Sequence, residues 1–411
     1  MIPDSGDHSQ ADPRSAQVAS LRVLATAYGA FILLGWTTAL VPSLVRVIEG
    51  EFGQDDAGIG FLFLLNALFY AGGAFVSGLL AARIGRRALL AGSALVIAVG
   101  LLTESLSQSW PMMLVGVSIC GVGAGAIDAG VNGVIMDVAA LGRGSALSRL
   151  HLFFSVGALA APLVIGTIVS AGLGWRVVVG ATALIAVVIA LPIRAVGAVP
   201  PRRRPAVAAA GRTAAADLRR PLAILGIAIA CAVAVEMGVS SWIVGFLAAE
   251  PMSVATLGLG LFWVGHASGR LVAARVADRF PPVAFAAACL LMSAAALAAA
   301  VVGPRGALQL VLFAVVGFGN GPSYPMIMTV AATLYPHRAA AISGYLTAAG
   351  IAGSVVYPPL MGFLSGSAGL GAGMLGASLL AVVSGVAVIV AGRGANRSRT
   401  PAVAPTGPVG R

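Results

Sequence analysis

Long apolar segments, almost free of charge, follow one another along nearly the whole chain. A helix that crosses a bilayer needs about 20 predominantly apolar residues. Twelve segments of roughly this length can be marked: 22–47, 57–81, 88–107, 111–136, 146–171, 176–195, 222–247, 254–277, 283–302, 307–334, 341–366 and 370–392. We expect each to be a helix, because an open strand edge leaves backbone polar groups unsatisfied in lipid.

The composition excludes most other classes of protein. Charged residues make up 9% of the chain and apolar residues 59%, against roughly 25% and 45–50% in soluble globular proteins. So few charges cannot cover the surface of a soluble protein of 411 residues. A soluble enzyme, a disordered chain and a collagen-like chain are therefore excluded, and the sequence predicts a multi-pass protein of the cell membrane.

The positive charges indicate the orientation in the membrane. All 25 basic residues are arginines, and the net charge is +11. If both termini are cytosolic, 22 arginines fall on the cytosolic side and only Arg46, Arg176 and Arg305 on the other. This bias follows the positive-inside rule. We therefore assign the charge to topology and expect no binding to nucleic acid.

A segment rich in proline and arginine, 197–220, divides the chain into two halves of six expected helices. The tail 393–411 has almost nothing to bury, which predicts disorder. The predicted organisation is a cytosolic tail (1–20), an N-terminal six-helix bundle (21–196), a cytosolic linker (197–220), a C-terminal six-helix bundle (221–392) and the cytosolic tail 393–411.

The two halves carry the same small residues in the same order. Gly121, Gly123 and Gly125 recur 196 positions later at 317, 319 and 321, and Pro162 recurs at 358. Arg83 and the residues around it recur 192 positions later, around position 275. Matches in one order at nearly one offset indicate a duplication. Two parallel six-helix repeats are an architecture of secondary transporters.

The loop after the second segment carries a specific motif. Residues 78–87 read GLLAARIGRR and resemble the pattern G-x-L-a-D-r-x-G-r-k of the major facilitator superfamily, except that Ala82 stands where the family has Asp. The resemblance covers residues 20–393. It implies an all-α membrane fold of twelve transmembrane helices in two six-helix repeats, with a cytosolic conformational latch. The matching latch residues are Gly78, Arg83, Gly85, Arg86 and Arg87 in the first half and Gly269, Arg270, Arg275, Asp278 and Arg279 in the second.

Four further runs are similar to a narrower branch, the fucose-permease-like transporters. They are G-x-G-x-G-A-I-D-x-x-x-N at 121–132, H-x-F-F-x-x-G-A-x-x-x-P at 151–162, E-x-G-x-x-x-W at 236–242 and G-P-S-Y-P at 321–325. The better-known members of that branch are proton-coupled sugar symporters. Drug antiporters usually carry an arginine near the position of Val117, and this chain has none there.

Two carboxyl groups fall deep inside expected spans. Asp128 lies in 111–136 and Glu236 in 222–247, where insertion of an acid costs about 2.5–3.5 kcal/mol. Burial favours the protonated form of a carboxyl, and entry of water favours its release of the proton. We predict these two acids as proton-coupling residues. Structural acids that bond to a neighbouring helix are the alternative.

Polar and aromatic side chains near these acids are the candidates for substrate binding. Asn132 follows Asp128 by four residues and so shares its helix face, and His266 shares a face with Arg270 in the same way. Packing inside the bundle is the alternative for every aromatic candidate. The predicted substrate-binding residues are Asn132, His151, Trp36, Trp242, Tyr324 and His266.

No pattern indicates a cofactor or a metal. The chain lacks the lysine that a phosphate-binding P-loop needs, and Cys120, Cys231 and Cys289 lie singly in apolar segments. We therefore expect a monomeric transporter without enzymatic activity, whose partners are a small-molecule substrate, protons and the bilayer. Proton symport of a small polar solute such as a sugar is the leading hypothesis. The alternatives are proton-driven efflux of a drug or metabolite, and a non-transporting receptor or lipid-handling protein.

The arginine distribution makes a direct prediction about topology. A single cysteine placed at position 205 of a chain without native cysteines should be labelled by an impermeant thiol reagent only after the cells are opened, since 197–220 is expected on the cytosolic side. Labelling of that cysteine from outside intact cells would reverse the predicted orientation.

Overall fold

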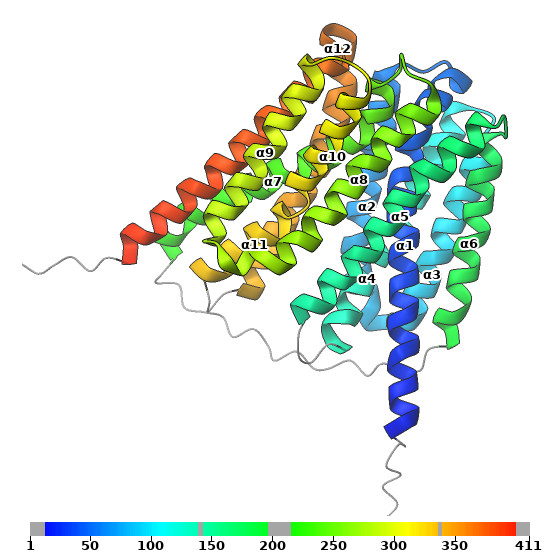
Figure 1. Cartoon of the computed structure of the whole chain (residues 1–411). Coiled ribbons are helices and arrows are strands. Elements are labelled where there is room, and N and C mark those ends of the chain that lie inside the picture. The colour runs from blue at the N-terminus through cyan, green and yellow to red at the C-terminus, as the bar shows by residue number, and fades with distance from the viewer. Residues whose placement is uncertain (1–12, 139–142, 196–214, 336–338, 400–411) are drawn as a thin grey trace, which may run out of the picture. The chain divides into compact units, whose positions relative to one another are not determined.

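The structure is a computed structural model of the chain. It describes residues 13–138, 143–195, 215–335 and 339–399, and nearly all of them are helical (Figure 1). The α-helices are α1 (Pro13–Phe52), α2 (Asp56–Ile84), α3 (Arg86–Ser105), α4 (Trp110–Val138), α5 (Arg143–Ser170), α6 (Trp175–Ala195), α7 (Ala215–Phe246), α8 (Met252–Val276), α9 (Pro282–Val302), α10 (Ala307–Asn320), α11 (Ser323–Leu334) and α12 (Ala339–Arg399).

The predicted all-helical membrane fold is confirmed, although the helices divide differently near the C-terminus. The expected span 307–334 is interrupted between α10 and α11. The expected spans 341–366 and 370–392 run together in α12, whose apolar part Ile342–Arg393 has 52 residues. A straight helix of that length would measure about 78 Å, far more than the roughly 30 Å of a bilayer core. Gly369, with φ 72°, breaks α12 into two crossings.

In the described part of the chain, nine helical stretches are long and apolar enough to cross a membrane. One of them is the double-length stretch of α12, while α6 and α8 are not among the nine. Large apolar side chains lie exposed on the helices, such as Phe75 at 73%. Together with the absence of enough charge to cover such faces, this identifies a multi-pass membrane protein.

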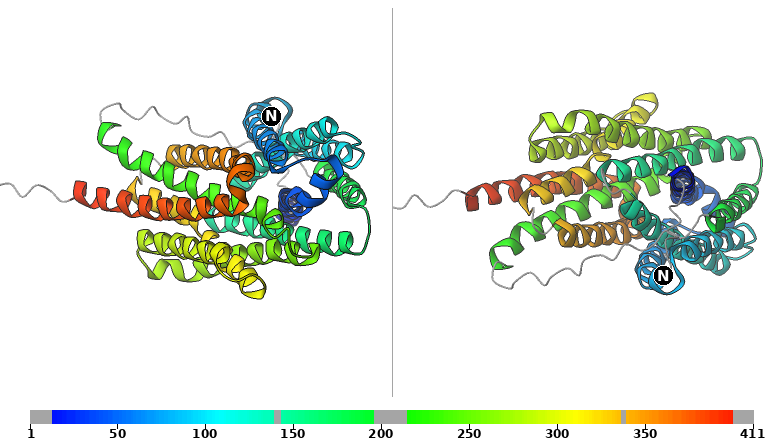
Figure 2. Two further views of the ribbon diagram at one scale, coloured as in Figure 1. Left: turned by 90° about the horizontal axis from the view of Figure 1, so that it is seen from above. Right: turned by 90° about the horizontal axis from the view of Figure 1, so that it is seen from below.

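The chain forms two compact units. The first comprises residues up to Val41 together with Leu65–Pro205, and the second comprises Pro42–Leu64 together with the chain from Ala206 onwards. The first division lies at Pro42 inside α1, where the missing N–H removes one helical hydrogen bond. Figure 2 shows that the helices within each unit lie side by side.

Glycines hold α2 against α4 in the first unit. A Cβ atom added at Gly73 would overlap the carbonyl of Val122, and one at Gly125 would overlap the carbonyl of Tyr70. At Gly121 the overlap would be with the carbonyl of Asn66. Small residues of this kind let two membrane helices approach until backbone meets backbone.

The second unit repeats these contacts between α8 and α10. Side chains at Gly265, Gly317 and Gly321 would overlap the carbonyls of Ala314, Phe262 and His266. Gly265 follows Gly73 by 192 positions, and Gly317 and Gly321 follow Gly121 and Gly125 by 196, the two offsets found in the sequence. The predicted duplication is therefore visible in the helix contacts of both units.

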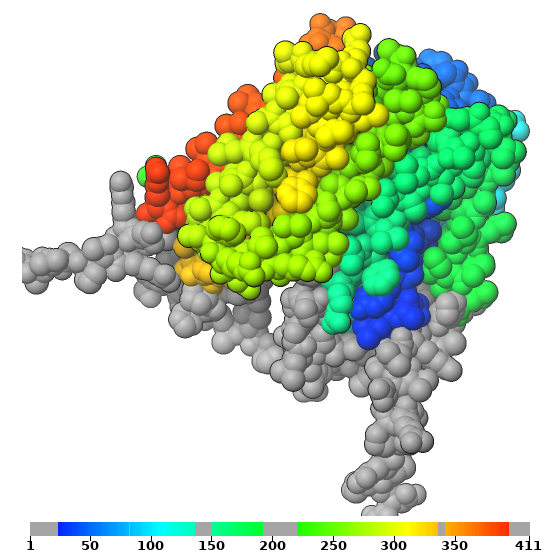
Figure 3. Space-filling view, in the orientation of Figure 1, coloured from blue at the N-terminus to red at the C-terminus, as the bar shows by residue number. Residues whose placement is uncertain are grey.

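The core of the second unit is made by α7, α9, α11 and α12. Fully buried members include Ile229, Leu290, Ile327 and Leu346. On the face seen in Figure 3, α8, α9 and α10 form a closely packed surface. Burial of each large aliphatic side chain away from water contributes about 1.5–3 kcal/mol before the chain-ordering cost.

Residues 42–64, at the end of α1 and the beginning of α2, pack within the second unit. The guanidinium of Arg46 donates to the Glu250 carbonyl at 2.8 Å. The ring of Phe63 meets the Trp242 ring edge to face, with centroids 5.5 Å apart. A Cβ at Gly362 would overlap the Asp56 carbonyl, so small residues again permit a close helix approach.

Some helix ends extend beyond the predicted spans. Residues 13–20, 215–220 and 393–399, predicted as parts of tails and linker, are the ends of α1, α7 and α12. Pro13 suits the first turn of α1, where its missing N–H would have had no helical partner. The rest of the predicted tails and linker, residues 1–12, 197–214 and 400–411, lies outside the described residues.

Two adjacent glycines of α2 test the backbone contact. Gly73→Ala should lower the stability of the purified protein by about 1–3 kcal/mol, the usual effect of overpacking, because its methyl group meets the Val122 carbonyl. Gly72→Ala is the matched control, since nothing lies within 4 Å of a Cβ there. Thermal unfolding in detergent measures both, and equal melting temperatures for the two variants would contradict the close contact.

Candidate functional site

The first unit places Asp128 between α4 and α2. The hydroxyl of Tyr70 on α2 donates to Asp128 Oδ2 at 2.7 Å. The amide of Asn132 donates to Asp128 Oδ1 at 2.8 Å, which confirms that the two residues share a helix face. The carboxyl group is thus held by two neutral donors, an arrangement that orients it without supplying a compensating positive charge.

The second unit places Glu236 of α7 against α8. Glu236 is 7% exposed, and His266 is fully buried. The Nε2 atom of His266 lies 3.1 Å from Glu236 Oε1, and an amino group of Arg270 lies 3.9 Å from the same oxygen. Because His266 and Arg270 are four residues apart, both face Glu236 from one side of α8. The second acid, unlike Asp128, therefore lies beside a positive charge.

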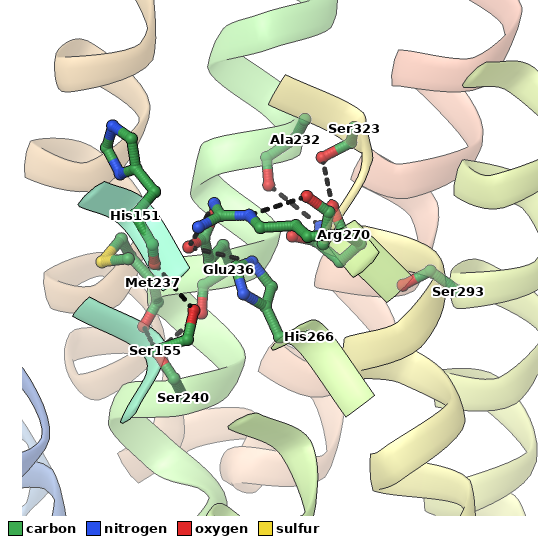
Figure 4. A network of polar contacts seen from close by, with 12 residues as sticks. His151, Ser155, Ala232, Glu236, Met237, Ser240, His266, Arg270, Ser293 and Ser323 are labelled. Carbon is green, nitrogen blue, oxygen red and sulfur yellow. Dashed lines mark hydrogen bonds and ion pairs between the residues drawn. The ribbon is translucent and has the colours of Figure 1, made fainter. Parts of the chain in front are cut away.

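A break between α10 and α11 holds Arg270 in place. Its Nε atom donates to the Gly321 carbonyl at 3.0 Å. That carbonyl would normally accept from the backbone N–H four residues later, but position 325 is a proline and has none. The sequence Gly321-Pro-Ser-Tyr-Pro325 thus exposes a backbone acceptor, and the guanidinium occupies it (Figure 4).

Several polar atoms in this cluster have no hydrogen-bond partner among the described residues. They are Nη1 of Arg270, Nδ1 of His266 and Oδ1 of Asn320. Asn320 itself is fully buried, and its amide nitrogen donates to the Ala232 carbonyl at 3.2 Å. Unsatisfied buried polar groups are rare and costly, so this part of α8 and α10 has capacity for additional partners.

The other predicted binding residues have different surroundings. Trp36 donates its ring N–H to the Thr182 hydroxyl at 3.0 Å. His151 packs edge-on against Phe31, with centroids 5.6 Å apart. Trp242 is fully buried and donates to the Pro358 carbonyl at 2.8 Å, joining α7 to α12. Trp242 therefore packs inside the second unit.

Tyr324 lies near the start of α11, three residues after the Gly321 whose carbonyl holds Arg270. Its hydroxyl forms a hydrogen bond of 3.0 Å with the hydroxyl of Thr347 on α12, and this pair is exposed. Tyr324 is close enough to Arg270 for an electrostatic interaction. The pair therefore adds two hydroxyl groups to the surroundings of the Glu236–His266–Arg270 cluster.

The predicted latch residues lie in the last two turns of α2, at the start of α3, in the C-terminal part of α8 and in the 3-10 turn Ala277–Arg279 that follows it. Gly85 has φ 79°, a left-handed conformation that favours glycine. Arg86 donates to the Gly133 carbonyl at 3.3 Å, and Arg275 bonds the Leu271 carbonyl of its own helix. Residues Arg83, Arg87, Asp278 and Arg279 are exposed. Three remain: Gly78 has open space beside it, a Cβ at Gly269 would overlap the Phe318 carbonyl, and Arg270 lies beside Glu236.

Sequence reasoning missed one partner of the acids, because Tyr70 was not connected with Asp128. It also did not single out Asn320, which bonds the Ala232 carbonyl, or Thr347, which bonds Tyr324. One signal for this site is present in the sequence. Pro322 and Pro325 follow Gly321, and a proline leaves the carbonyl four residues before it without its helical hydrogen bond. In the described part of the chain, no group of three or more His, Cys, Asp or Glu side chains is arranged to bind a metal ion.

Comparison with known proteins gives a family match over most of the chain. The protein-family model described as Major Facilitator Superfamily matches this sequence at residues 26–345 and again at residues 225–409. A bacterial homologue of the human lysosomal transporter Spinster, solved in an inward-facing and unoccupied conformation, superposes with a TM-score of 0.74 at 17% identity. The match covers 95% of this chain and 100% of that one.

Curated relatives match over shorter stretches. The sodium-dependent glucose transporter 1A of Mus musculus is 25% identical over 136 residues, 33% of this chain and 32% of that protein. The uncharacterized MFS-type transporter YfkL of Bacillus subtilis (strain 168) is 29% identical over 153 residues, 36% of this chain and 38% of that protein. The matched part thus spans only about a third of each relative.

Proposed function

The chain belongs to the Major Facilitator Superfamily, and from this premise we propose that it is a proton-coupled symporter of a small polar solute such as a sugar. It is a multi-pass membrane transporter of that superfamily. The proposal adds the coupling ion, the class of solute and a mechanism of alternating access, in which two repeats expose a midplane site to each side in turn.

The two buried acids are the main support for proton coupling. A carboxyl group in hydrocarbon takes up a proton when water is excluded and releases it when water enters. Among the described residues, Asp128 accepts side-chain hydrogen bonds from two neutral donors, Tyr70 and Asn132, and from no cationic side chain. Glu236 lies beside His266 and Arg270 and therefore gains or loses a proton according to what else binds there.

The names of several relatives support a sugar as the solute. Four of them, from mouse, rat, Xenopus laevis and human, are sodium-dependent glucose transporters, each matched over about a third of this chain. Their names raise sodium as a competing coupling ion. We retain the proton because the two carboxyl groups are on separate helix pairs, each with side-chain partners of its own, so that each can take up a proton by itself.

The predicted latch and topology belong to the same proposal. Gly85 and the arginines around it would stabilise one conformation from the cytosolic side, where both termini would lie, and the protein would act as a monomer in the cell membrane. The two predicted six-helix bundles, 21–196 and 221–392, would be the moving parts.

Neutral isosteres of the two acids test proton coupling. Asp128→Asn and Glu236→Gln keep the side-chain shape and remove the titratable group. At least one of them should abolish proton-driven accumulation of solute in proteoliposomes while solute exchange, which needs no net proton movement, continues. Asp128→Asn is favoured because Asn132 provides an adjacent hydrogen-bonding group. The measurement compares uptake under an imposed proton gradient, an imposed sodium gradient and exchange conditions.

Glu104→Gln is the matched control, because Glu104 is a buried acid of α3 that belongs to neither cluster. It should retain proton-driven accumulation. If both acid variants still accumulate solute with the pH dependence of the wild type, neither acid couples transport to protons. Export from cells would favour the efflux alternative, and solute binding without flux would favour a receptor.

A further inference from the structure

Arg270 is a half-buried cation with most of its hydrogen-bonding capacity unused. A guanidinium has five N–H donors. In the described residues Nε bonds the Gly321 carbonyl, Nη1 has no hydrogen-bond partner, and Nη2 approaches Glu236 only to 3.9 Å, beyond hydrogen-bond distance. The side chain is 19% exposed, so it remains within reach of a small molecule.

The contact between Arg270 and Glu236 is weak for such a pair. A structural arginine–carboxylate pair usually forms two parallel hydrogen bonds of about 2.7–2.9 Å. Here the guanidinium is fixed by a backbone carbonyl at the α10–α11 break and turned so that it meets one carboxylate oxygen at long range. Glu236 therefore balances the charge of Arg270 without occupying its donors.

Hydroxyl and amide groups occur on the segment that anchors the guanidinium. The exposed Tyr324–Thr347 hydroxyl pair is within electrostatic range of Arg270. Asn320, which precedes Gly321 in the chain, has a buried acceptor oxygen without a donor among the described residues. A ligand could use these groups together: its anionic group would accept hydrogen bonds from Arg270, and its hydroxyl groups would bond to the neighbouring polar side chains. This combination is the complement of a hydroxylated acid rather than of a neutral sugar.

We propose that the transported solute is a small hydroxylated monocarboxylate, such as a sugar acid, whose carboxylate binds the guanidinium of Arg270 while Glu236 takes up a proton. This inference rests on the proposed function and specifies its substrate class.

The net charge of the site favours binding of a solute with one carboxylate together with one proton. Without solute, the positive Arg270 faces the negative Glu236. A bound carboxylate would leave one excess negative charge in a buried place, which is strongly unfavourable, unless Glu236 accepts one proton from water. A phosphate with two negative charges would still leave an excess. The site therefore favours a monocarboxylate.

Two side chains of α8 that face Glu236 within the second unit agree with this assignment. They are His266 and Arg270, and Tyr324 on α11 is within electrostatic range of Arg270. Tyr357 on α12 donates its hydroxyl to the Gly373 carbonyl instead. His266 is fully buried beside a cation, which disfavours a second positive charge. Glu236 is thus the group that takes the proton.

Matched acid and alcohol pairs test the proposal on the purified full-length protein. Glycerate and glycerol, gluconate and glucose, and glycerol phosphate are titrated while thermal unfolding is recorded, because a ligand that binds the folded state raises the melting temperature. At least one acid should stabilise the wild type, and its neutral partner and the phosphate should not. Arg270→Gln should weaken binding of that acid about 10- to 100-fold, as expected for loss of hydrogen bonds to a charged group.

Three variants make the result specific to this cluster. Arg305→Gln removes an exposed arginine from the same unit and should bind the acid like the wild type. Arg270→Lys keeps the charge but not the planar fork, so it should bind the acid more weakly and still reject the neutral partner, even if Arg270→Gln fails to fold. Calorimetry in buffers of different ionisation enthalpy should show one proton taken up per acid bound by the wild type and none by Glu236→Gln.

The inference is wrong if no acid of the panel stabilises the wild type, if a neutral partner stabilises it equally, or if Arg270→Gln and Arg305→Gln bind the acid alike. Proton-driven transport of a neutral sugar would retain the proposed function and overturn only this inference. Binding of an acid through Arg270 without any transport would support the binding mode inferred for Arg270 and overturn the proposed transport function.

Discussion

Contact between helix backbones at glycine positions is the constraint on which the second-unit site depends. Gly265 and Gly269 of α8 lie against carbonyls of α10, and Gly317 and Gly321 of α10 lie against carbonyls of α8. This close approach brings the side chain of Arg270 to the freed Gly321 carbonyl. A larger residue at these positions would separate the helices and leave the guanidinium without that anchor. The position of the Arg270 guanidinium thus depends on glycines, which have no side chain to keep the two helices apart.

The duplication preserves this backbone contact but changes the chemistry that it carries. In the first unit the contact between α2 and α4 brings Tyr70 to Asp128. The corresponding positions of the second unit, 192 and 196 residues later, hold Phe262 and Tyr324, so the acid is lost from that helix pair. Glu236 on α7 supplies the acid instead, and Arg270 accompanies it. One unit therefore holds a carboxyl among neutral donors, and the other holds a carboxyl beside a cation.

Features that depend on spacing along one helix were predictable from the sequence. The apolar segments, the repeated glycines, the turn at Gly85 and the shared face of Asp128 and Asn132 are of this kind. Contacts between helices were not predictable, because a single sequence does not say which faces meet. Arg270 shows the difference. Its place after Gly269 fits the loop motif and suggested a latch, whereas the structure places its guanidinium beside Glu236, 34 residues earlier on another helix.

Movement of protons with the solute is the central claim, and external pH measures it directly. A solute that stabilises the purified protein is added to lightly buffered, de-energised cells that produce the chain, and the external pH is recorded against cells that produce Glu236→Gln. The account predicts a transient rise in external pH, since inward symport removes protons from the medium. No change, or acidification of the medium, would contradict proton symport.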